Sequence, residues 1–346
     1  MSRTTAILAA VGFVLVVALT FVFEPFRNFQ LATIAAYLCA VGGLTMLTGV
    51  NGQLSLGHAA LMACGAYCYA FTANALGEAE IDGVLLLVLP LVAAVVGSAI
   101  LGFVIGIAGA RLHGPYLAGV TLAVVLALPA FTSTFSNVFG GDMGLWVTVA
   151  RKPEGLEGRG STEMFQAWVA IACAALVLLL LQNLLRSNFG RQMRAVRDNE
   201  VAASISGINV YRTKVVAFTV SSAAAGIGGG LLAFITQSAS PGAYSLIFSL
   251  FLLMAAVIGG IGTLAGAIWG SVLLVLLPEA IGSLTKSLSL PPEVAQRLDG
   301  NLAIALFGIV LVLVVIIAPH GIQGLVTKTW RRLQARGTLQ SVSIPK

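Results

Sequence analysis

Residues 187–214 read SNFGRQMRAVRDNEVAASISGINVYRTK and form a polar interruption between two long apolar runs. This interruption, with Arg186 directly before it, holds six of the chain's 19 Lys and Arg residues but only two acids, Asp198 and Glu200. Moving Lys and Arg across a bilayer is unfavourable, so a cationic loop between membrane-length segments stays on the cytoplasmic side. The loop therefore predicts how the chain is oriented in a membrane.

The composition of the chain is that of an integral membrane protein. It has 346 residues, of which 58% are hydrophobic and 9% are charged, and its mean hydropathy is +0.98. Soluble domains carry about 25% charged residues. The formal net charge of +6 suggests nucleic acid as one class of partner. The basic residues cluster in loops, however, which indicates membrane topology and no nucleic-acid partner.

Apolar runs define the expected spans, since a membrane-spanning helix needs about 20 mostly apolar residues. The first run is longer than the apolar region of about 7–15 residues in a cleaved signal peptide, which is the alternative there. The run from 245 to 282 is divided at GGIGTLAG (259–266), because an even number of crossings must separate the central loop from a basic cytoplasmic tail. The sequence thus predicts an all-α integral membrane protein with about ten transmembrane helices, some broken, near residues 6–23, 30–48, 57–76, 84–109, 116–135, 165–185, 215–235, 245–261, 264–282 and 301–318.

The distribution of charge agrees with this topology. Thirteen of the 19 basic residues fall on the expected cytoplasmic side, and 11 of the 13 acids fall on the expected outer side. A wrong topology would rarely separate both signs so well. We therefore expect a multi-pass protein with both termini in the cytoplasm.

The central loop also has a predicted structure. Most residues from Arg191 to Ser206 are good helix formers, and Gly207 follows at the place where a left-handed residue ends a helix. A short cytoplasmic helix of this kind can lie in a groove on a soluble partner. A solvated loop that only obeys the positive-inside rule is the alternative. The apolar side chains of the expected helix are Met193, Val196, Val201 and Ile205.

A second unusual segment is LTGVNGQLSLGHAALMACGAY at residues 47–67. Its polar side chains should not face lipid, and its glycines interrupt a regular helix, so it must lie against protein or a water-filled path. Broken helices of this kind present backbone groups and helix ends to a substrate near the middle of the membrane. A short cytoplasmic turn between two ordinary spans is the alternative.

Glycines recur in two later spans. Such rows of small residues let helix backbones approach each other closely. They are not a nucleotide-binding signature, because no strand precedes them. The rows consist of Gly226, Gly228, Gly229 and Gly230, and of Gly262, Gly266 and Gly270.

No pattern in the sequence indicates catalysis or nucleotide binding. The chain has no G-x-x-x-x-G-K-[ST] loop, and its three histidines lie on separate segments. No Asp, Glu, Lys or Arg falls within a predicted span core, where a titratable group would couple transport to protons. Transport coupled to sodium, with the ion bound by carbonyl and hydroxyl groups, is an alternative that the sequence leaves open. Cys64 and Cys68 lie one helical turn apart, but without further ligands nearby we expect free thiols and no metal site.

The stretch GRQMRAVRDNEVAASISGINVYRTKVVAFTVSSAAAGIGGGLLA (190–233) closely resembles a cytoplasmic signature of the LivM-like family. Members of this family are permease subunits of ABC importers for branched-chain and other hydrophobic amino acids. In that family the matching loop forms coupling helices that dock on the ATPase subunit. The resemblance implies ATPase-coupling roles for Gly190, Arg191, Arg194, Ala195, Arg197, Asp198, Asn199, Glu200, Ala203, Gly207 and Ile208.

Three further segments resemble the same family. GQLSLGHAA (52–60) and RLHGPYLAGVTLAVV (111–125), which departs from the family at His113 and Gly119, belong to its core. They imply a translocation path at Asn51, Gln53, Ser55, Gly57, His58 and Thr121, although a Thr that bonds to its own helix is the commoner case. FGGDMGL (139–145) resembles the family's TGGxxGL element. It implies that a binding protein docks at Gly140, Gly141 and Asp142, where a plain solvated loop explains the composition equally well.

The resemblance covers roughly residues 35–325 and implies an ABC importer permease fold in the bacterial inner membrane. The expected organisation is an N-terminal span (1–28), a permease domain (29–326) with its coupling loop at 186–214, and a basic cytoplasmic tail (327–346). No enzymatic activity and no cofactor are expected in this chain, since ATP binds the partner subunits. The implied partners are a second homologous permease subunit, two ATPase subunits, a periplasmic substrate-binding protein and membrane lipid.

Import would proceed by alternating access, with closure of the ATPase subunits transmitted through the coupling loop. The substrate stays open among branched-chain amino acids, other amino acids, urea and amides. The alternative from a different class is a cation-coupled secondary transporter.

Overall fold

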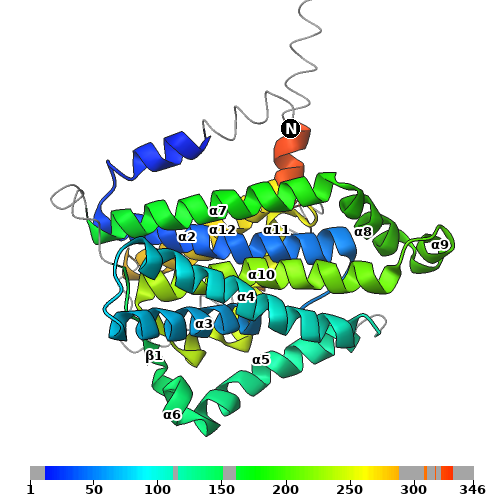
Figure 1. Cartoon of the computed structure of the whole chain (residues 1–346). Helices are drawn as coiled ribbons and strands as arrows, with labels where there is room; N and C mark the ends of the chain where they lie inside the picture. Colours follow the sequence, from blue (N-terminus) through cyan, green and yellow to red (C-terminus); the bar gives the residue numbers. More distant parts are fainter. Residues whose placement is uncertain are drawn as a thin grey trace, which may run out of the picture.

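The computed structural model describes residues 12–111, 116–150, 161–287, 308–309, 316 and 321–329. Most of the long helices run side by side along one direction, which is the architecture of a multi-pass helical membrane protein (Figure 1). Within the described residues, six are long and apolar enough to cross a membrane: α2 (Pro25–Thr45) with its π-helical end η1 (Met46–Val50), α3 (His58–Glu78), α4 (Val84–Gly109), α5 (Tyr116–Thr134), α7 (Thr162–Arg186) and α10 (Val210–Thr236). Two further apolar helices follow, α11 (Leu246–Gly260) and α12 (Leu264–Ser287).

The predicted spans agree with these helices through the middle of the chain. The division of the run 245–282 is confirmed, because α11 ends at Gly260 and α12 begins at Leu264. The predicted total of about ten transmembrane helices is not confirmed. The last predicted span, 301–318, lies almost wholly outside the described residues, and the first is described only from residue 12, with 12–19 helical.

Helix α10 lies at the centre of the bundle and packs against α2, α3 and α4. Its glycines allow this packing, since a side chain at Gly229 would collide with the backbone of Met62 in α3, and one at Gly226 would collide with Ser98 in α4. Because lipid provides no hydrophobic drive between helices, close contact of this kind is what holds them together. The prediction that the glycine row lets helices approach closely is therefore confirmed for α10.

The two ends of the bundle carry different structures. Two short helices, α8 (Asn188–Asp198) and α9 (Glu200–Ile205), lie at the end where α7 stops and α10 starts (Figure 1). Toward the other end lie α6 and the antiparallel strands β1 and β2, in which Leu145 pairs with Ala239. The elements of that end are α6 (Ser136–Phe139), the 3-10 turn η2 (Gly141–Met143), β1 (Leu145–Trp146), β2 (Ser238–Ala239) and the 3-10 turn η4 (Pro241–Tyr244).

The prediction of one continuous helix from Arg191 to Ser206 is wrong, since α8 and α9 divide this stretch at Asn199. The backbone of Asn199 is extended, with φ −161° and ψ 112°. Its side-chain Oδ1 accepts hydrogen bonds from the N–H groups of Val201 and Ala202, both at 3.0 Å. Asn is a favoured N-cap because its side chain satisfies the free N–H groups of a helix start. The position of the helix end is confirmed, because Gly207 has a left-handed φ of +82°.

Candidate functional site

The first candidate site is the break between α2 and α3. Residues 52–57 form no helix, and α3 starts at His58. The Nε2 atom of His58 lies 3.2 Å from the hydroxyl oxygen of Ser221 in α10. Ser221 is eleven residues beyond the helix start at Val210, which corresponds to about 16 Å at about 1.5 Å per residue. The break therefore returns deep into the bundle and is not a short turn at its surface.

Helix α5 holds one side of the returning segment. The hydroxyl of Thr121 accepts a hydrogen bond from the N–H of Leu56 at 3.0 Å and donates one to the carbonyl of Ala118 at 3.0 Å. Thr121 thus faces the bundle interior and also bonds to its own helix. A side chain at Gly57 would collide with the Thr121 carbonyl. The absence of a side chain at Gly57 therefore lets the segment lie directly on α5.

Helices α10 and α11 hold the start of α3. The N–H of Ala59 donates to the hydroxyl oxygen of Ser249 in α11 at 3.3 Å. His58 Nδ1 lies 3.4 Å from the hydroxyl oxygen of Ser55, and both side chains are fully buried. With Ser221 on its other nitrogen, the imidazole of His58 links the break to α10. These contacts fix the segment by hydrogen bonds between uncharged groups.

Asn51 and Gln53 are buried amides with incomplete hydrogen bonding. Asn51 is 2% exposed, and neither amide atom has a partner among the described residues. The Oε1 atom of Gln53 also has none there. Leaving a buried polar group unpaired is unfavourable by about 1–3 kcal/mol. Amides of this kind at a helix break can bind water or a polar solute that passes through the bundle.

The second candidate site is the loop formed by α8 and α9, and two of its charged side chains contact the bundle. The Nη1 atom of Arg197 donates to the carbonyl of Gly49 at 2.7 Å, and the same guanidinium bonds to Asp198 Oδ1 at 2.9 and 3.1 Å. Glu200 forms an ion pair with Lys214 of α10 at 2.6 Å. The loop is therefore connected to α2 through α8 and to α10 through α9.

The rest of α8 is held against the end of α7. The Nη2 atom of Arg194 donates to the carbonyl of Leu185 at 2.8 Å, and a side chain at Gly190 would collide with that carbonyl. Arg191 instead bonds to Asn188 within α8. Met193 and Val196 are buried. Ala195 is half-buried.

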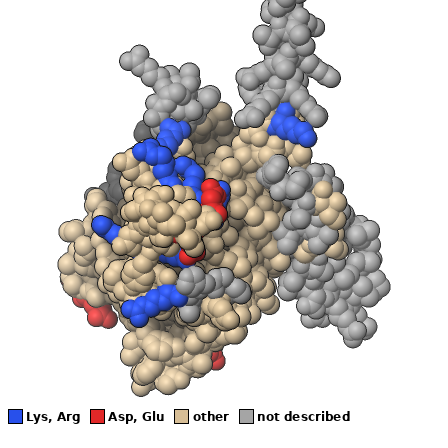
Figure 2. Space-filling model, turned by 90° about the vertical axis from the view of Figure 1, so that its right-hand side faces the viewer, with Lys and Arg blue, Asp and Glu red and all other residues tan. Residues whose placement is uncertain are grey.

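In α9, Ala203 is buried and its carbonyl accepts the N–H of Ile208 at 3.0 Å, which closes the helix end. Val201 and Ile205 point the other way and are 68% and 81% exposed. They are four residues apart and therefore lie on one face of the helix. Figure 2 shows several Lys and Arg on this end of the molecule, with a few Asp and Glu beside them and other residues between them.

The third candidate site lies toward the opposite end, at η2 and β1. Gly140 and Gly141 both have left-handed φ values, +73° and +59°, and shape the turn that exposes Asp142. Asn74 of α3 holds the strand that follows, because its side chain donates to the carbonyl of Trp146 and accepts from the N–H of Thr148, both at 2.8 Å. The turn is therefore a fixed surface with exposed polar and apolar groups.

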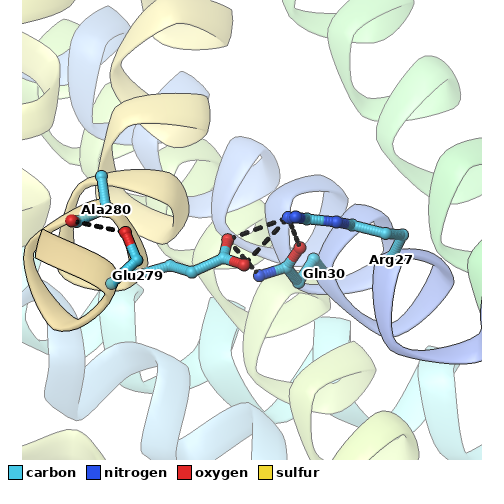
Figure 3. A network of polar contacts seen from close by, with 5 residues as sticks. Arg27, Gln30, Glu279 and Ala280 are labelled. Carbon is cyan, nitrogen blue, oxygen red and sulfur yellow. Dashed lines mark hydrogen bonds and ion pairs between the residues drawn. The ribbon is translucent and has the colours of Figure 1, made fainter. Parts of the chain in front are cut away.

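Sequence reasoning assigned no site role to Ser221, Ser249 or Lys214, and it missed one polar network. Near the start of α2, Arg27 Nη1 bonds to Glu279 Oε1 of α12 at 2.9 Å, and the buried Gln30 donates to Glu279 Oε2 at 2.7 Å (Figure 3). Arg27 also donates to Gln30 at 2.8 Å. Partners 249 and 252 residues apart leave no local signal in the sequence.

The chemistry of these sites is that of hydrogen bonding and ion pairing. Within the residues that the structure describes, no group of three or more His, Cys, Asp or Glu side chains could hold a metal ion. Cys64 and Cys68 are free thiols. The break offers hydroxyl, amide, imidazole and backbone groups, which can bind and release a solute.

Known proteins resemble this chain over most of its length. A family model described as branched-chain amino acid transport system, permease component, matches residues 27–318. The chain is 31% identical over 290 residues to the high-affinity branched-chain amino acid transport system permease protein LivM of Salmonella typhimurium, covering 77% of this chain and 66% of that protein. It therefore spans just under two thirds of that relative's length. No solved structure matches the chain.

Two other relatives extend the comparison. The chain is 26% identical over 298 residues to a probable branched-chain amino acid transport permease protein LivM of Methanocaldococcus jannaschii, covering 82% of this chain and 81% of that protein. It is also 34% identical over 99 residues to the L-arabinose transport system permease protein AraH of Escherichia coli, covering 29% of each. The family match includes the helix break, α8, α9 and α10. The chain therefore belongs to the family of permease components of branched-chain amino acid transport systems.

Proposed function

We propose that this chain is the transmembrane permease subunit of an ABC importer for branched-chain or other hydrophobic amino acids. The observation that carries the proposal is the exposed apolar pair Val201 and Ile205, on a loop that is connected to two bundle helices. In this proposal separate ATPase subunits drive alternating access through that loop. The other partners are a second homologous permease subunit and a periplasmic substrate-binding protein.

Helix α9 has the properties of a docking element. Its apolar pair lies at a cationic end of the molecule, where membrane lipid does not reach in the proposed orientation. Burial of an aliphatic side chain contributes about 1.5–3 kcal/mol. A groove on a soluble partner can supply that burial for both residues. Glu200, which pairs with Lys214, and Arg197, which bonds to Gly49, would pass the partner's movement to α10 and α2.

The break between α2 and α3 is the proposed translocation path. Its polar groups lie deep in the bundle and carry no formal charge, and Asn51 has amide atoms without a partner among the described residues. An amino acid with an apolar side chain still needs hydrogen bonds for its amino and carboxylate groups as it crosses. Neutral amide, hydroxyl and backbone groups supply these bonds without holding the solute too tightly.

The proposed orientation places α8 and α9 in the cytoplasm and β1 outside. The loop between α3 and α4, near β1, carries Glu80 and Asp82, whereas the α8 end carries Lys and Arg. The turn at Gly140, Gly141 and Asp142 is then the proposed docking surface for the binding protein. The bacterial inner membrane, the cytoplasmic termini and the division at residues 28 and 326 belong to the same proposal.

Transport by the reconstituted complex tests this function. The permease would be placed in vesicles with its partner permease and ATPase subunits, and uptake of leucine, isoleucine, valine, urea and L-arabinose would be measured with the cognate binding protein. We expect uptake of a branched-chain amino acid that requires ATP and the binding protein. Uptake of urea or arabinose without uptake of any amino acid would assign that solute as the substrate instead. Uptake by this chain alone, down a sodium or proton gradient, would overturn the proposal.

A further inference from the structure

Of the three arginines in α8, Arg197 is the one that bonds to η1, just before the helix break. Arg191 bonds within α8, and Arg194 bonds to the end of α7. The guanidinium of Arg197 instead donates from Nη1 to the Gly49 carbonyl at 2.7 Å. This carbonyl belongs to the last turn of α2 and η1, where carbonyl groups have no partner inside the helix. A cation there is favourable, both as a charge-assisted donor and at the negative end of the helix dipole.

Steric contacts hold the same place as well. Gly52 has a φ of +76°, and a Cβ built on it would lie 2.8 Å from Cγ of Arg197. Three residues earlier, a side chain at Gly49 would collide with the backbone of Gly262, in the turn between α11 and α12. The end of η1 is therefore in close contact with both the Arg197 side chain and that turn. A shift away from α8 would break the Arg197 contact.

The π-helical geometry of η1 adds to this argument. π-Helical turns are rare in proteins, and those that occur are often found at functional sites. Here it directly precedes the segment that returns into the bundle to meet Thr121, Ser221 and Ser249. A displacement at Gly49 is thereby passed to residues 51–57 through continuous backbone.

We infer that Arg197 is a positioning residue that makes the end of α2, and with it the segment 51–57, follow the movement of α8. This inference rests on the proposed function, in which a motor subunit moves the loop. Asp198 joins the guanidinium on its exposed side at 2.9 Å, so Arg197 links a solvent-facing carboxylate to a buried carbonyl. The contact persists through the transport cycle and acts as a rigid connection.

The first test removes the hydrogen bond from Arg197 to Gly49 in the reconstituted complex. Arg197→Gln shortens the side chain and removes the charge. We expect ATP hydrolysis within about twofold of wild type but leucine uptake reduced at least tenfold, so that less leucine is moved per ATP. The control is Lys328→Gln, which removes one positive charge from an exposed position outside the coupling loop. An unchanged ratio of leucine to ATP in Arg197→Gln would overturn the inference.

The second test replaces the hydrogen bond by a covalent bond. A Cβ at Gly52 would lie 3.4 Å from Cβ of Arg197, close to the about 3.5–4.5 Å between the Cβ atoms of a disulfide. In a variant without native cysteines, Gly52→Cys with Arg197→Cys places the two side chains close enough for a disulfide, and Gly52→Cys alone controls for the strain of a side chain at φ +76°. We expect the oxidised complex to move more leucine per ATP than the reduced one, and at least threefold more than Arg197→Cys alone. An oxidised complex that moves less leucine than the reduced one would show that the contact must open.

The two tests separate this inference from the function on which it rests. If the wild-type complex moves no amino acid with ATP, the proposed function fails and Arg197 is not the cause. If the wild type moves leucine with ATP and Arg197→Gln is equally well coupled, the function stands and the positioning role fails. If Arg197→Gln reaches the membrane at a low level, the cysteine pair still gives an answer. Its reduced and oxidised states are compared in one preparation, so the amount of protein is the same in both.

Discussion

Lys214 and Glu200 form an ion pair across the junction between α10 and α9, with 2.6 Å between Nζ and Oε1. The two side chains are unequally exposed, 7% for Lys214 and 40% for Glu200. A buried ammonium group without a partner is much more unfavourable than an exposed carboxylate without one. The pair therefore holds α9 mainly by satisfying the Lys214 side chain.

This asymmetry predicts an order of stability for two substitutions. Glu200→Gln leaves the buried Lys214 charge uncompensated and should lower the free energy of unfolding by about 1–3 kcal/mol, between the values for exposed and buried pairs. Lys214→Met removes the buried charge, keeps the apolar stem, and should be less destabilising. Thermal unfolding of the purified chain in detergent measures both. The reverse order would show that Lys214 is not the group that needs the pair.

The network of Arg27, Gln30 and Glu279 in Figure 3 predicts a second asymmetry. Glu279→Ala leaves the buried Gln30 amide without its acceptor and should destabilise the chain by about 1–3 kcal/mol. Arg27→Ala leaves the Gln30–Glu279 bond intact and removes a half-exposed pair, worth about 0–1 kcal/mol. It also removes the donor to Gln30 Oε1, but water can enter the half-exposed space left by Arg27 and replace that donor. Urea unfolding in detergent at low and high salt measures the difference. Salt should weaken the Arg27 effect only, and equal losses for both variants would contradict this arrangement.

One substitution made at two glycines tests the packing of α10. Gly229→Ala would push a methyl group into the backbone of α3 and should destabilise the bundle by at least about 1–3 kcal/mol. Gly119→Ala in α5 meets nothing within 4 Å and should be neutral or stabilising, because Ala favours a helix over Gly. Thermal unfolding midpoints of the two variants give the comparison. A Gly229→Ala protein as stable as Gly119→Ala would mean that α10 and α3 are not in close contact.

Much of the fold follows from local patterns in the sequence. Apolar runs of membrane length located the helices, glycines at 259–266 located the turn between α11 and α12, and Gly207 located the end of α9. These features depend on residues close together in the chain. The division of the loop at Asn199 was not predicted, because helix propensity favoured continuation while the Asn side chain satisfied the start of a new helix.

The direction of the charged side chains could not be predicted. A pattern of Arg residues indicates a cytoplasmic loop, but it does not show that Arg197 turns inward to Gly49, 148 residues away in sequence. Likewise, the polar residues of 51–57 indicated protected surroundings, whereas their partners Ser221 and Ser249 are ordinary serines in apolar helices. Only the packing of α5, α10 and α11 brings those hydroxyls to the break.

The central claim is that an ATPase subunit binds this chain at α9 on the cytoplasmic side of the membrane. Labelling of Ile205→Cys with a membrane-impermeant maleimide, in a variant without native cysteines, tests it most directly. We predict rapid labelling in inside-out vesicles, little labelling in intact spheroplasts, and protection in inside-out vesicles when the ATPase subunits are added. Labelling from the outside of spheroplasts, or equal labelling with and without the ATPase subunits, would contradict the claim.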